Sequence, residues 1–180
     1  MNNAQQKEFN QQCLYTALME LMKEKKFEKI SIGELCDRAG VSRMTYYRSY
    51  NSKEDILLQH LDESFTDFMH RIEAIPDPTA YDISLVFFEY WKNEEKSFLL
   101  TVMRSRLTAQ ITEKFYHYLD TTLEIVVPKK NVPIYVKSFL SGGLCKMLFD
   151  WVRYGFKDSP QSMAVFLTAG NDALMNLVEL

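Results

Sequence analysis

The chain has 180 residues, of which 47% are hydrophobic and 25% charged. This length fits one domain or a little more, and the hydrophobic share excludes intrinsic disorder and a fibrous repeat. The first residues lack the apolar stretch of a signal peptide, and no apolar run approaches the roughly 20 residues of a membrane helix. We therefore expect a soluble, cytoplasmic protein. Its net charge of -3 does not mark it as a general binder of polyanions.

Helical periodicity dominates the chain, and strand signals are almost absent. An apolar stripe from Phe9 to Met22 predicts a first helix, which the charged residues 23–26 close. The fold class expected from the whole sequence is all-α, with about nine helices.

Two short helices are predicted next, each with its own start signal. Ser31 and Glu34 have the spacing of a capping box. Gly40 can adopt the positive φ of a sharp helix exit. Ser42 is a second N-cap and opens a helix that ends near Ser49.

A long helix should begin near Lys53, because Ser52 and Asp55 form another cap pair, and it should stop before Pro76. Proline and glycine punctuate the rest of the chain. Further helices are predicted over residues 79–93, 98–104, 108–126, 133–154 and 160–178.

Charge is unevenly distributed along the chain. Residues 1–55 carry nine Lys or Arg and eight Asp or Glu, whereas residues 56–180 carry 12 and 16. Four cations, Arg38, Arg43, Arg48 and Lys53, follow one another at intervals of five residues with no acid between them. Such a window fits either a small nucleic-acid contact or an ordinary solvated face.

Residues 31–50 have the order of a helix-turn-helix: short helix, glycine-containing turn, short helix. The second helix would offer the hydroxyl groups of Ser42, Thr45 and Tyr47 to phosphates. Arg43 and Arg48 could reach phosphates or guanine edges. Lys53 would lie at a helix N-terminus, which already favours an anion.

The same stretch resembles the DNA-binding segment of the tetracycline-repressor (TetR) family of bacterial regulators. The residues that carry the resemblance are Ala39-Gly-Val-Ser, then Thr45-Tyr-Tyr, and then Ser52-Lys-Glu before a long helix. The match covers roughly the first 70 residues. It implies three helices in a DNA-binding head, residues 1–52, and an effector-binding and dimerising body, residues 53–180, entered through a connecting helix at 53–75.

The resemblance also implies roles for single residues. Phosphate-contacting positions are Ser31, Ser42, Thr45, Tyr47 and Lys53. Positions that face bases are Arg43, Met44 and Tyr46. The resemblance gives no operator sequence.

Residues 139–163 resemble the C-terminal region of a subgroup that includes regulators of dihydroxyacetone kinase genes. One recognition helix makes too little contact for operator-level affinity, so we expect a homodimer on an inverted repeat. The last two helices would form its interface, through Leu140, Gly143, Leu144, Trp151, Phe166, Gly170 and Leu174.

The body is rich in aromatic residues, most of which must be core. A subset could line a pocket for a small-molecule effector of unknown identity. The candidates are His60, Phe87, Tyr90, Trp91, Arg104, His117 and Phe139.

No catalytic constellation is present, and the three scattered cysteines and three scattered histidines suggest no metal site. We therefore expect no enzyme, no cofactor and no membrane partner. The hypothesis is a DNA-binding transcriptional regulator, most simply a ligand-responsive repressor. The alternative is a TetR-like helical scaffold that binds a lipid or another apolar ligand without DNA.

Overall fold

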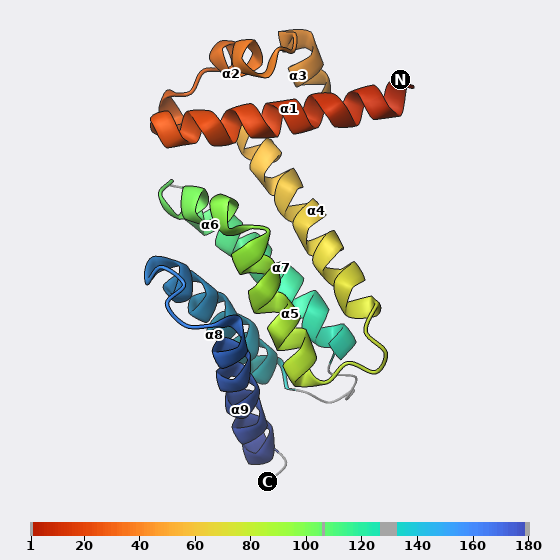
Figure 1. Cartoon of the computed structure of the whole chain (residues 1–180), viewed down its shortest axis with the longest axis vertical. Coiled ribbons are helices and arrows are strands. Elements are labelled where there is room, and N and C mark those ends of the chain that lie inside the picture. Colours follow the sequence, from red (N-terminus) through yellow and green to blue (C-terminus); the bar gives the residue numbers. More distant parts are fainter. Residues whose placement is uncertain (1, 106, 127–132, 179–180) are drawn as a thin grey trace. The chain divides into compact units, whose positions relative to one another are not determined.

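The structure is a computed structural model that describes residues 2–105, 107–126 and 133–178, with side chains at all of these except 108, 124–126 and 174–178. The described residues form nine α-helices, one 3-10 helix and no strand, which confirms the all-α prediction (Figure 1). The elements are α1 (Asn3–Glu24), η1 (Phe27–Lys29), α2 (Ile32–Ala39), α3 (Arg43–Ser49), α4 (Lys53–Glu73), α5 (Ala80–Asn93), α6 (Lys96–Met103), α7 (Thr108–Val126), α8 (Ile134–Arg153) and α9 (Pro160–Val178).

The helix ends follow local capping chemistry closely. The Ser52 hydroxyl accepts the backbone N–H of Asp55 at 3.2 Å, and the Asp55 carboxylate accepts the N–H of Ser52 at 3.1 Å. At the end of α8, Gly155 has φ 74°, and the N–H of Phe156 donates to the Trp151 carbonyl at 2.8 Å. This is a Schellman closure, in which a left-handed glycine lets the last carbonyls find donors.

Two predicted start signals differ in detail. Pro133 is the N-cap of α8 and not its first helical residue. Ser31 forms only half of a capping box: its hydroxyl accepts the N–H of Glu34, but the Glu34 carboxylate pairs with Lys25. An opposite charge within reach attracts a carboxylate more strongly than a backbone amide does.

The chain divides into two compact units. The first consists of Met1–Glu63 and Thr101–Thr108, and the second of Ser64–Leu100 and Ala109–Leu180. Helix α4 contributes residues to both.

In the first unit, α1 packs against α2 and α3. Leu14, Leu18 and Leu21 supply the buried side of α1, and Leu35 and Tyr46 the buried sides of α2 and α3. The apolar stripe was expected to begin at Phe9, but that side chain is 58% exposed, because the first turns of α1 lie outside this core.

The second unit has an aromatic core. Trp91 lies 4.8 Å from the Phe115 ring, and Phe65 stacks on Tyr118 at 4.3 Å between ring centroids. One buried polar pair accompanies them, since the Ser64 hydroxyl donates to the Glu95 carboxylate at 2.8 Å. Stacked and edge-to-face rings stabilise such a core beyond the apolar area they bury.

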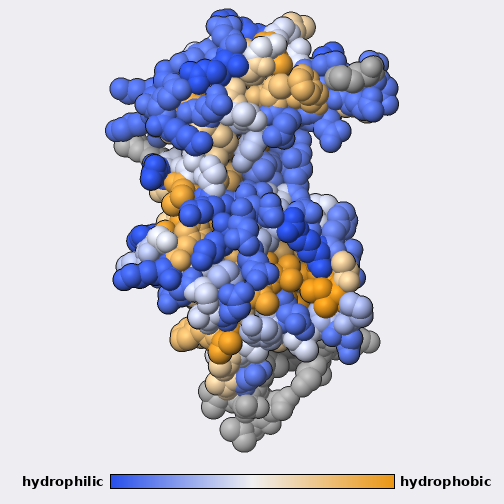
Figure 2. Space-filling model, in the orientation of Figure 1, coloured by the Kyte–Doolittle hydropathy of each residue, from blue (hydrophilic) through white to orange (hydrophobic). Residues whose placement is uncertain are grey.

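Hydrophobic residues on the face shown in Figure 2 lie in separate patches on a mostly hydrophilic surface. Among the described helices, none combines the length and the apolar content that crossing a membrane requires.

Candidate nucleic-acid interface

Helices α2 and α3 are two capped helices joined by a tight turn. Gly40 has φ 66°, and its N–H and that of Val41 donate back to carbonyls at the end of α2. The Ser42 hydroxyl then accepts the backbone N–H of Thr45 at 3.1 Å and so starts α3. These local bonds produce the predicted helix-turn-helix, with α3 over Arg43–Ser49 as the sequence indicated.

Five of the predicted DNA-contacting residues lie together on the exposed side of α3. They line one shallow surface depression: Ser42, Met44, Thr45, Tyr47 and Arg48. Met44 is 80% exposed and Tyr47 57% exposed, although both are large and partly apolar. Such side chains on a short, positively charged helix fit a surface that another molecule covers.

Tyr46 was expected to face bases, and the structure corrects this. Its side chain is fully buried, with the ring of Tyr50 at 6.0 Å and that of Tyr47 at 5.2 Å between centroids. Burial raises the pKa of the Tyr46 hydroxyl to about 12. Tyr46 therefore anchors α3 to the rest of the first unit.

The Ser42 and Thr45 hydroxyls lie 2.9 Å apart and hydrogen bond to each other. A single hydrogen bond between two hydroxyls uses only one of their two protons, and the bond that Ser42 accepts from the Thr45 N–H uses neither. The other remains able to donate to a phosphate oxygen.

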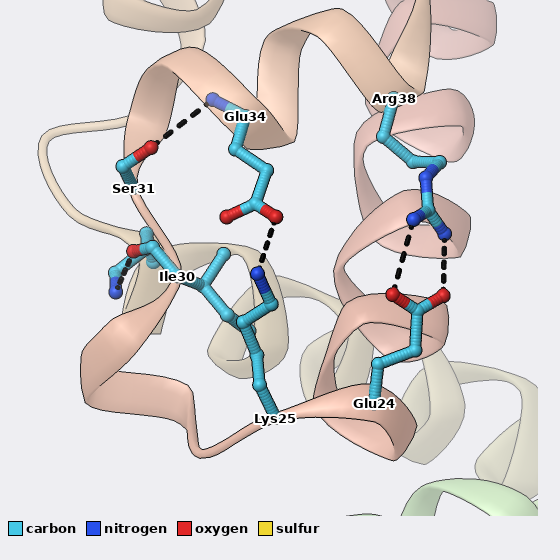
Figure 3. A network of polar contacts seen from close by, with 7 residues as sticks. Glu24, Lys25, Ile30, Ser31, Glu34 and Arg38 are labelled. Carbon is cyan, nitrogen blue, oxygen red and sulfur yellow. Dashed lines mark hydrogen bonds and ion pairs between the residues drawn. The ribbon is translucent and has the colours of Figure 1, made fainter.

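Two of the four evenly spaced cations are engaged within the protein. Arg38 makes two bonds to Glu24, at 2.9 and 3.1 Å, and joins α2 to α1 (Figure 3). These bonds hold the pKa of Glu24 below its usual value. The Lys53 ammonium donates to the carbonyls of Phe27 and Ile30 at 2.9 and 2.6 Å.

Arg43 and Arg48 are different. Both side chains are exposed, and among the described residues neither has an ion pair or a side-chain hydrogen bond. The basic window, residues 38–53, therefore contains two available cations on α3, Arg43 and Arg48. Its other two cations, Arg38 and Lys53, hold neighbouring elements together. Ser31, the remaining predicted contact, is exposed at the start of α2.

A second polar groove, beside α3, was missed by the sequence analysis. It is lined by Thr45, Arg48 and Ser49 of α3 and by residues from the first turns of α1: Asn3, Gln6, Lys7 and Asn10. Lys7 adds a third cation next to Arg48. No local signal marks these residues, because only the packing of α1 on α3 brings them together.

The residues predicted for an effector site are not gathered in one place. A cavity of about 170 Å³ in the second unit is lined mainly by apolar side chains, and Phe87 is the one predicted residue that reaches it. Tyr90 and Trp91 belong to the aromatic core, whereas Arg104, His117 and Phe139 are exposed. His60 lies in the first unit and stacks on Tyr15 at 3.9 Å.

Some of the predicted dimer residues are buried within the chain, and others are exposed. Trp151 is buried in its own chain, where its indole N–H donates to the Asp158 carbonyl at 3.1 Å, and Leu140 is 9% exposed. Leu144 is half-buried. Gly143, Phe166 and Gly170 are exposed, and the side chain of Leu174 lies outside the described residues.

Exposed apolar residues on α8 and α9 extend beyond the predicted set. They are Ile134, Tyr135 and Phe139 of α8, Tyr154 at the C-cap of α8, and Val165 of α9. The structure buries one side of α8 within the chain and leaves another apolar side exposed.

Comparisons with known proteins address the chain as a whole. Residues 14–59 match the family described as "Bacterial regulatory proteins, tetR family", and residues 79–169 match "Transcriptional regulator C-terminal region". An uncharacterised HTH-type transcriptional regulator from Haemophilus influenzae is 25% identical over 158 residues, which cover 81% of this chain and 77% of the relative.

Solved structures share the fold. Lin0861 from Listeria innocua superposes with a TM-score of 0.72 at 20% identity, over 98% of this chain and 95% of that one. The dihydroxyacetone kinase operon activator DhaS gives a TM-score of 0.64 at 16% identity, over 93% of this chain and 97% of that one. A transcriptional regulator from Aquifex aeolicus gives 0.59 at 19% identity, over 92% and 99%.

Proposed function

This chain belongs to the TetR family of bacterial transcriptional regulators, and from that premise we propose that it binds one operator sequence as a homodimer and releases it when a small effector binds. It is a helix-turn-helix DNA-binding regulator and not an enzyme. Such a regulator would act in the cytoplasm, where the chromosome is. We propose which residues contact DNA, and we also propose that the chain forms a dimer, that it binds an effector and that it represses transcription.

The observation that carries the proposed DNA face is the pair of available cations on α3. Arg43 occupies the first turn of a helix that is capped and anchored from below, and Arg48 lies in the last turn. We assign Arg43 and Met44 to base edges in the major groove. We assign the other residues of the surface depression to phosphates, and Lys7 with them; they are Ser42, Thr45, Tyr47 and Arg48.

Ser31 and Lys53 remain in the proposal with reduced roles. The Ser31 hydroxyl accepts one bond and keeps its proton for a phosphate. Lys53 uses two of its three ammonium donors on carbonyls, so at most one can reach DNA. We take residues 1–52 as the DNA-binding head and residues 53–180 as the body.

The proposed dimer rests on the exposed apolar residues of α8 and α9, and not on the buried Leu140 and Trp151. Phe139 and Phe166 are 65% and 70% exposed, and the exposed Gly143 and Gly170 would allow two helices to approach closely. Two chains related by a two-fold axis would present two α3 helices to two half-sites.

The proposed effector site is the cavity beside Phe87. Its mainly apolar lining favours a small, largely apolar molecule. Ser84 and Thr122 already donate their hydroxyl protons to carbonyls of their own helices, which leaves Asn171 and Asp172 as the polar lining residues that could orient it. An effector can weaken DNA binding only if it binds one conformation of the body more tightly than another.

The salt dependence of binding tests the DNA face. An operator is first selected from random duplex DNA, and its affinity is then measured over a range of salt concentrations. Each phosphate neutralised by a cation contributes about -0.9 to the slope of log affinity against log salt. Because the proposed dimer carries one Arg48 in each chain, we expect Arg48→Ala to make the slope on the complete operator shallower by about two such contributions.

Arg38→Gln is the matched control, because it removes a cation from the same window that is paired with Glu24. We expect it to leave the slope unchanged. If the parent chain selects no sequence, the proposed function is wrong, and binding of apolar ligands without DNA becomes the better hypothesis. If both variants change the slope alike, our division of the four cations is wrong.

A further inference from the structure

Gly33 has no backbone reason to be glycine. It is the second residue of α2 and lies in its first turn, and it is not among the residues with positive φ. Glycine is less favourable than alanine in a helix, because it loses more conformational freedom. Something other than its own conformation must account for the missing side chain.

The space next to Gly33 is occupied by the guanidinium of Arg43. A Cβ built on Gly33 would lie 2.5 Å from Nη2, 3.2 Å from Cζ and 3.5 Å from Nε of Arg43. The first of these distances is too short for any real contact. The arginine of the recognition helix therefore lies directly across the first turn of α2 and can do so only because residue 33 has no side chain.

The electrostatic surroundings of Arg43 also bear on its position. No carboxylate among the described residues pairs with its guanidinium. Its charge is felt by Cys36 on α2, where burial raises the pKa of the thiol and Arg43 acts in the opposite direction. The guanidinium is thus close to α2 and exposed, and no described residue forms an ion pair with it.

We infer that Gly33 determines the base specificity of this regulator indirectly, by making room for the Arg43 guanidinium at the first turn of α2. Gly33 is a positioning residue, and Arg43 is the residue that contacts the base. Guanine is the base we expect at the contacted position, because its O6 and N7 match the two-pronged donor set of arginine. This inference rests on the proposed function, since it deepens the reading of the operator by α3.

A side chain at residue 33 would displace Arg43 at little cost to folding. The obstructing atoms are the far end of a long, flexible, exposed side chain, which can rotate away. Gly33→Ala should therefore leave the thermal unfolding of the chain unchanged or raise its midpoint slightly. The effect should appear in sequence discrimination.

A double-mutant cycle tests this. Affinities for the selected operator, and for operators changed at each base pair, are measured for the parent, Gly33→Ala, Arg43→Ala and the double variant. We expect Gly33→Ala to lose about tenfold in discrimination at one base pair per half-site. Arg43→Ala should lose discrimination at the same pair, and adding Gly33→Ala to Arg43→Ala should change nothing further.

Gly142→Ala is the control, because a Cβ there meets nothing within 4 Å. A nuclear magnetic resonance measurement on the free protein adds a readout without DNA: the Arg43 Nε–Hε signal should shift in Gly33→Ala and stay in place in Gly142→Ala. If the signal is unmoved, or if Gly33→Ala acts equally with and without Arg43, the inference is overturned while the proposed function stands. If the parent selects no operator, both fall.

Discussion

Lys53 is held by backbone carbonyls and by an aromatic ring. Its ammonium bonds the carbonyls of Phe27 and Ile30 and lies 4.5 Å from the centroid of the Phe27 ring. Both carbonyl residues are buried; Phe27 is the first residue of the 3-10 segment between α1 and α2, and Ile30 is its C-cap. One cation from the first turn of α4 thereby fixes a connection that has few bonds of its own.

We predict that Lys53→Met destabilises the chain. Methionine keeps the apolar stem but removes the donors, which leaves two carbonyls without the partner they have now and costs about 1–3 kcal/mol. Chemical denaturation of the purified chain measures this. Lys29→Met, which changes an exposed lysine of the same segment, should have little effect. An unchanged free energy of unfolding in Lys53→Met would contradict the structural role.

The Arg38–Glu24 pair should make stability depend on pH in the acid range. The pKa of Glu24 in the folded chain is lowered, chiefly by the hydrogen bonds from Arg38. The resulting stabilisation is fully present above the unfolded pKa, near 4.5, and is lost as the pH falls through the lower folded value. We predict that Glu24→Gln loses less stability than the parent between about pH 5 and about pH 3.

Unfolding curves recorded at several pH values check this prediction. Glu8→Gln is a suitable control, since Glu8 is an exposed acid on the same helix with no described ion pair. Parallel curves for the parent and Glu24→Gln would mean that Glu24 gains nothing from Arg38 in solution.

At the scale of the element, the boundaries were predictable because caps are local. Ser42, Gly40 and Gly155 act through bonds to residues within five positions. The partners of long charged side chains were not predictable in this way. Arg38 bonds to Glu24, 14 residues away, and Lys53 bonds to the carbonyl of Phe27, 26 residues away. Two of the four cations in the basic window therefore make contacts within the protein.

Burial posed the same difficulty for the candidate site. Tyr46 and Tyr47 are adjacent and identical, yet the first is fully buried and the second 57% exposed. The face of a seven-residue helix is decided by its tertiary neighbours, which a short apolar pattern does not resolve. In α8 the chain covers one apolar side and leaves another exposed, and the apolar pattern alone does not distinguish the two sides.

The N-terminus of α4 yields a prediction at this scale. Burial alone would raise the pKa of Asp55, but bonds from the Ser52 hydroxyl and from the N–H groups of Asn51 and Ser52 outweigh it and lower the pKa. We expect Asp55→Ala to cost about 0.5–1.5 kcal/mol at neutral pH, because the bonds of the carboxylate are lost while the Ser52 hydroxyl can still accept the N–H of residue 55. The cost should shrink in acid, where the parent's carboxylate becomes protonated.

Glu54→Ala separates capping from charge in this test. Glu54 lies in the same first turn of α4 and has the same charge, but makes no described cap bond. Denaturation at neutral and acid pH should therefore distinguish the two variants. Equal losses would indicate a general effect of negative charge near a helix N-terminus.

At the scale of the whole molecule, charge is divided between regions with different tasks. Residues 1–55 are close to neutral, while residues 56–180 carry 12 basic and 16 acidic residues. With two available arginines on α3, a single chain has few cations to offer to DNA. We expect this weak attraction to phosphates to limit non-specific binding and to make operator affinity depend on the proposed dimer, in which two chains contact DNA together.

Dimerisation through α8 and α9 is therefore the prediction on which function depends most. Phe166 is 70% exposed and lies beside Met163 in a surface hollow, so a glutamate in its place costs the folded monomer little. In a dimer the same glutamate would bring a charge into an apolar interface without a partner, which is strongly unfavourable. We predict that the parent has twice the chain mass by light scattering and that Phe166→Glu has the mass of one chain.

The DNA-binding consequence follows from the same variant. A monomer engages one half-site, so Phe166→Glu should bind a single half-site as the parent does and lose its advantage on the complete inverted repeat. Tyr116→Glu, on α7, changes another aromatic residue that is 40% exposed and should remain dimeric. A dimeric Phe166→Glu with intact operator affinity would exclude this face of α9 as the interface and would turn attention to the exposed Tyr135 and Phe139 of α8.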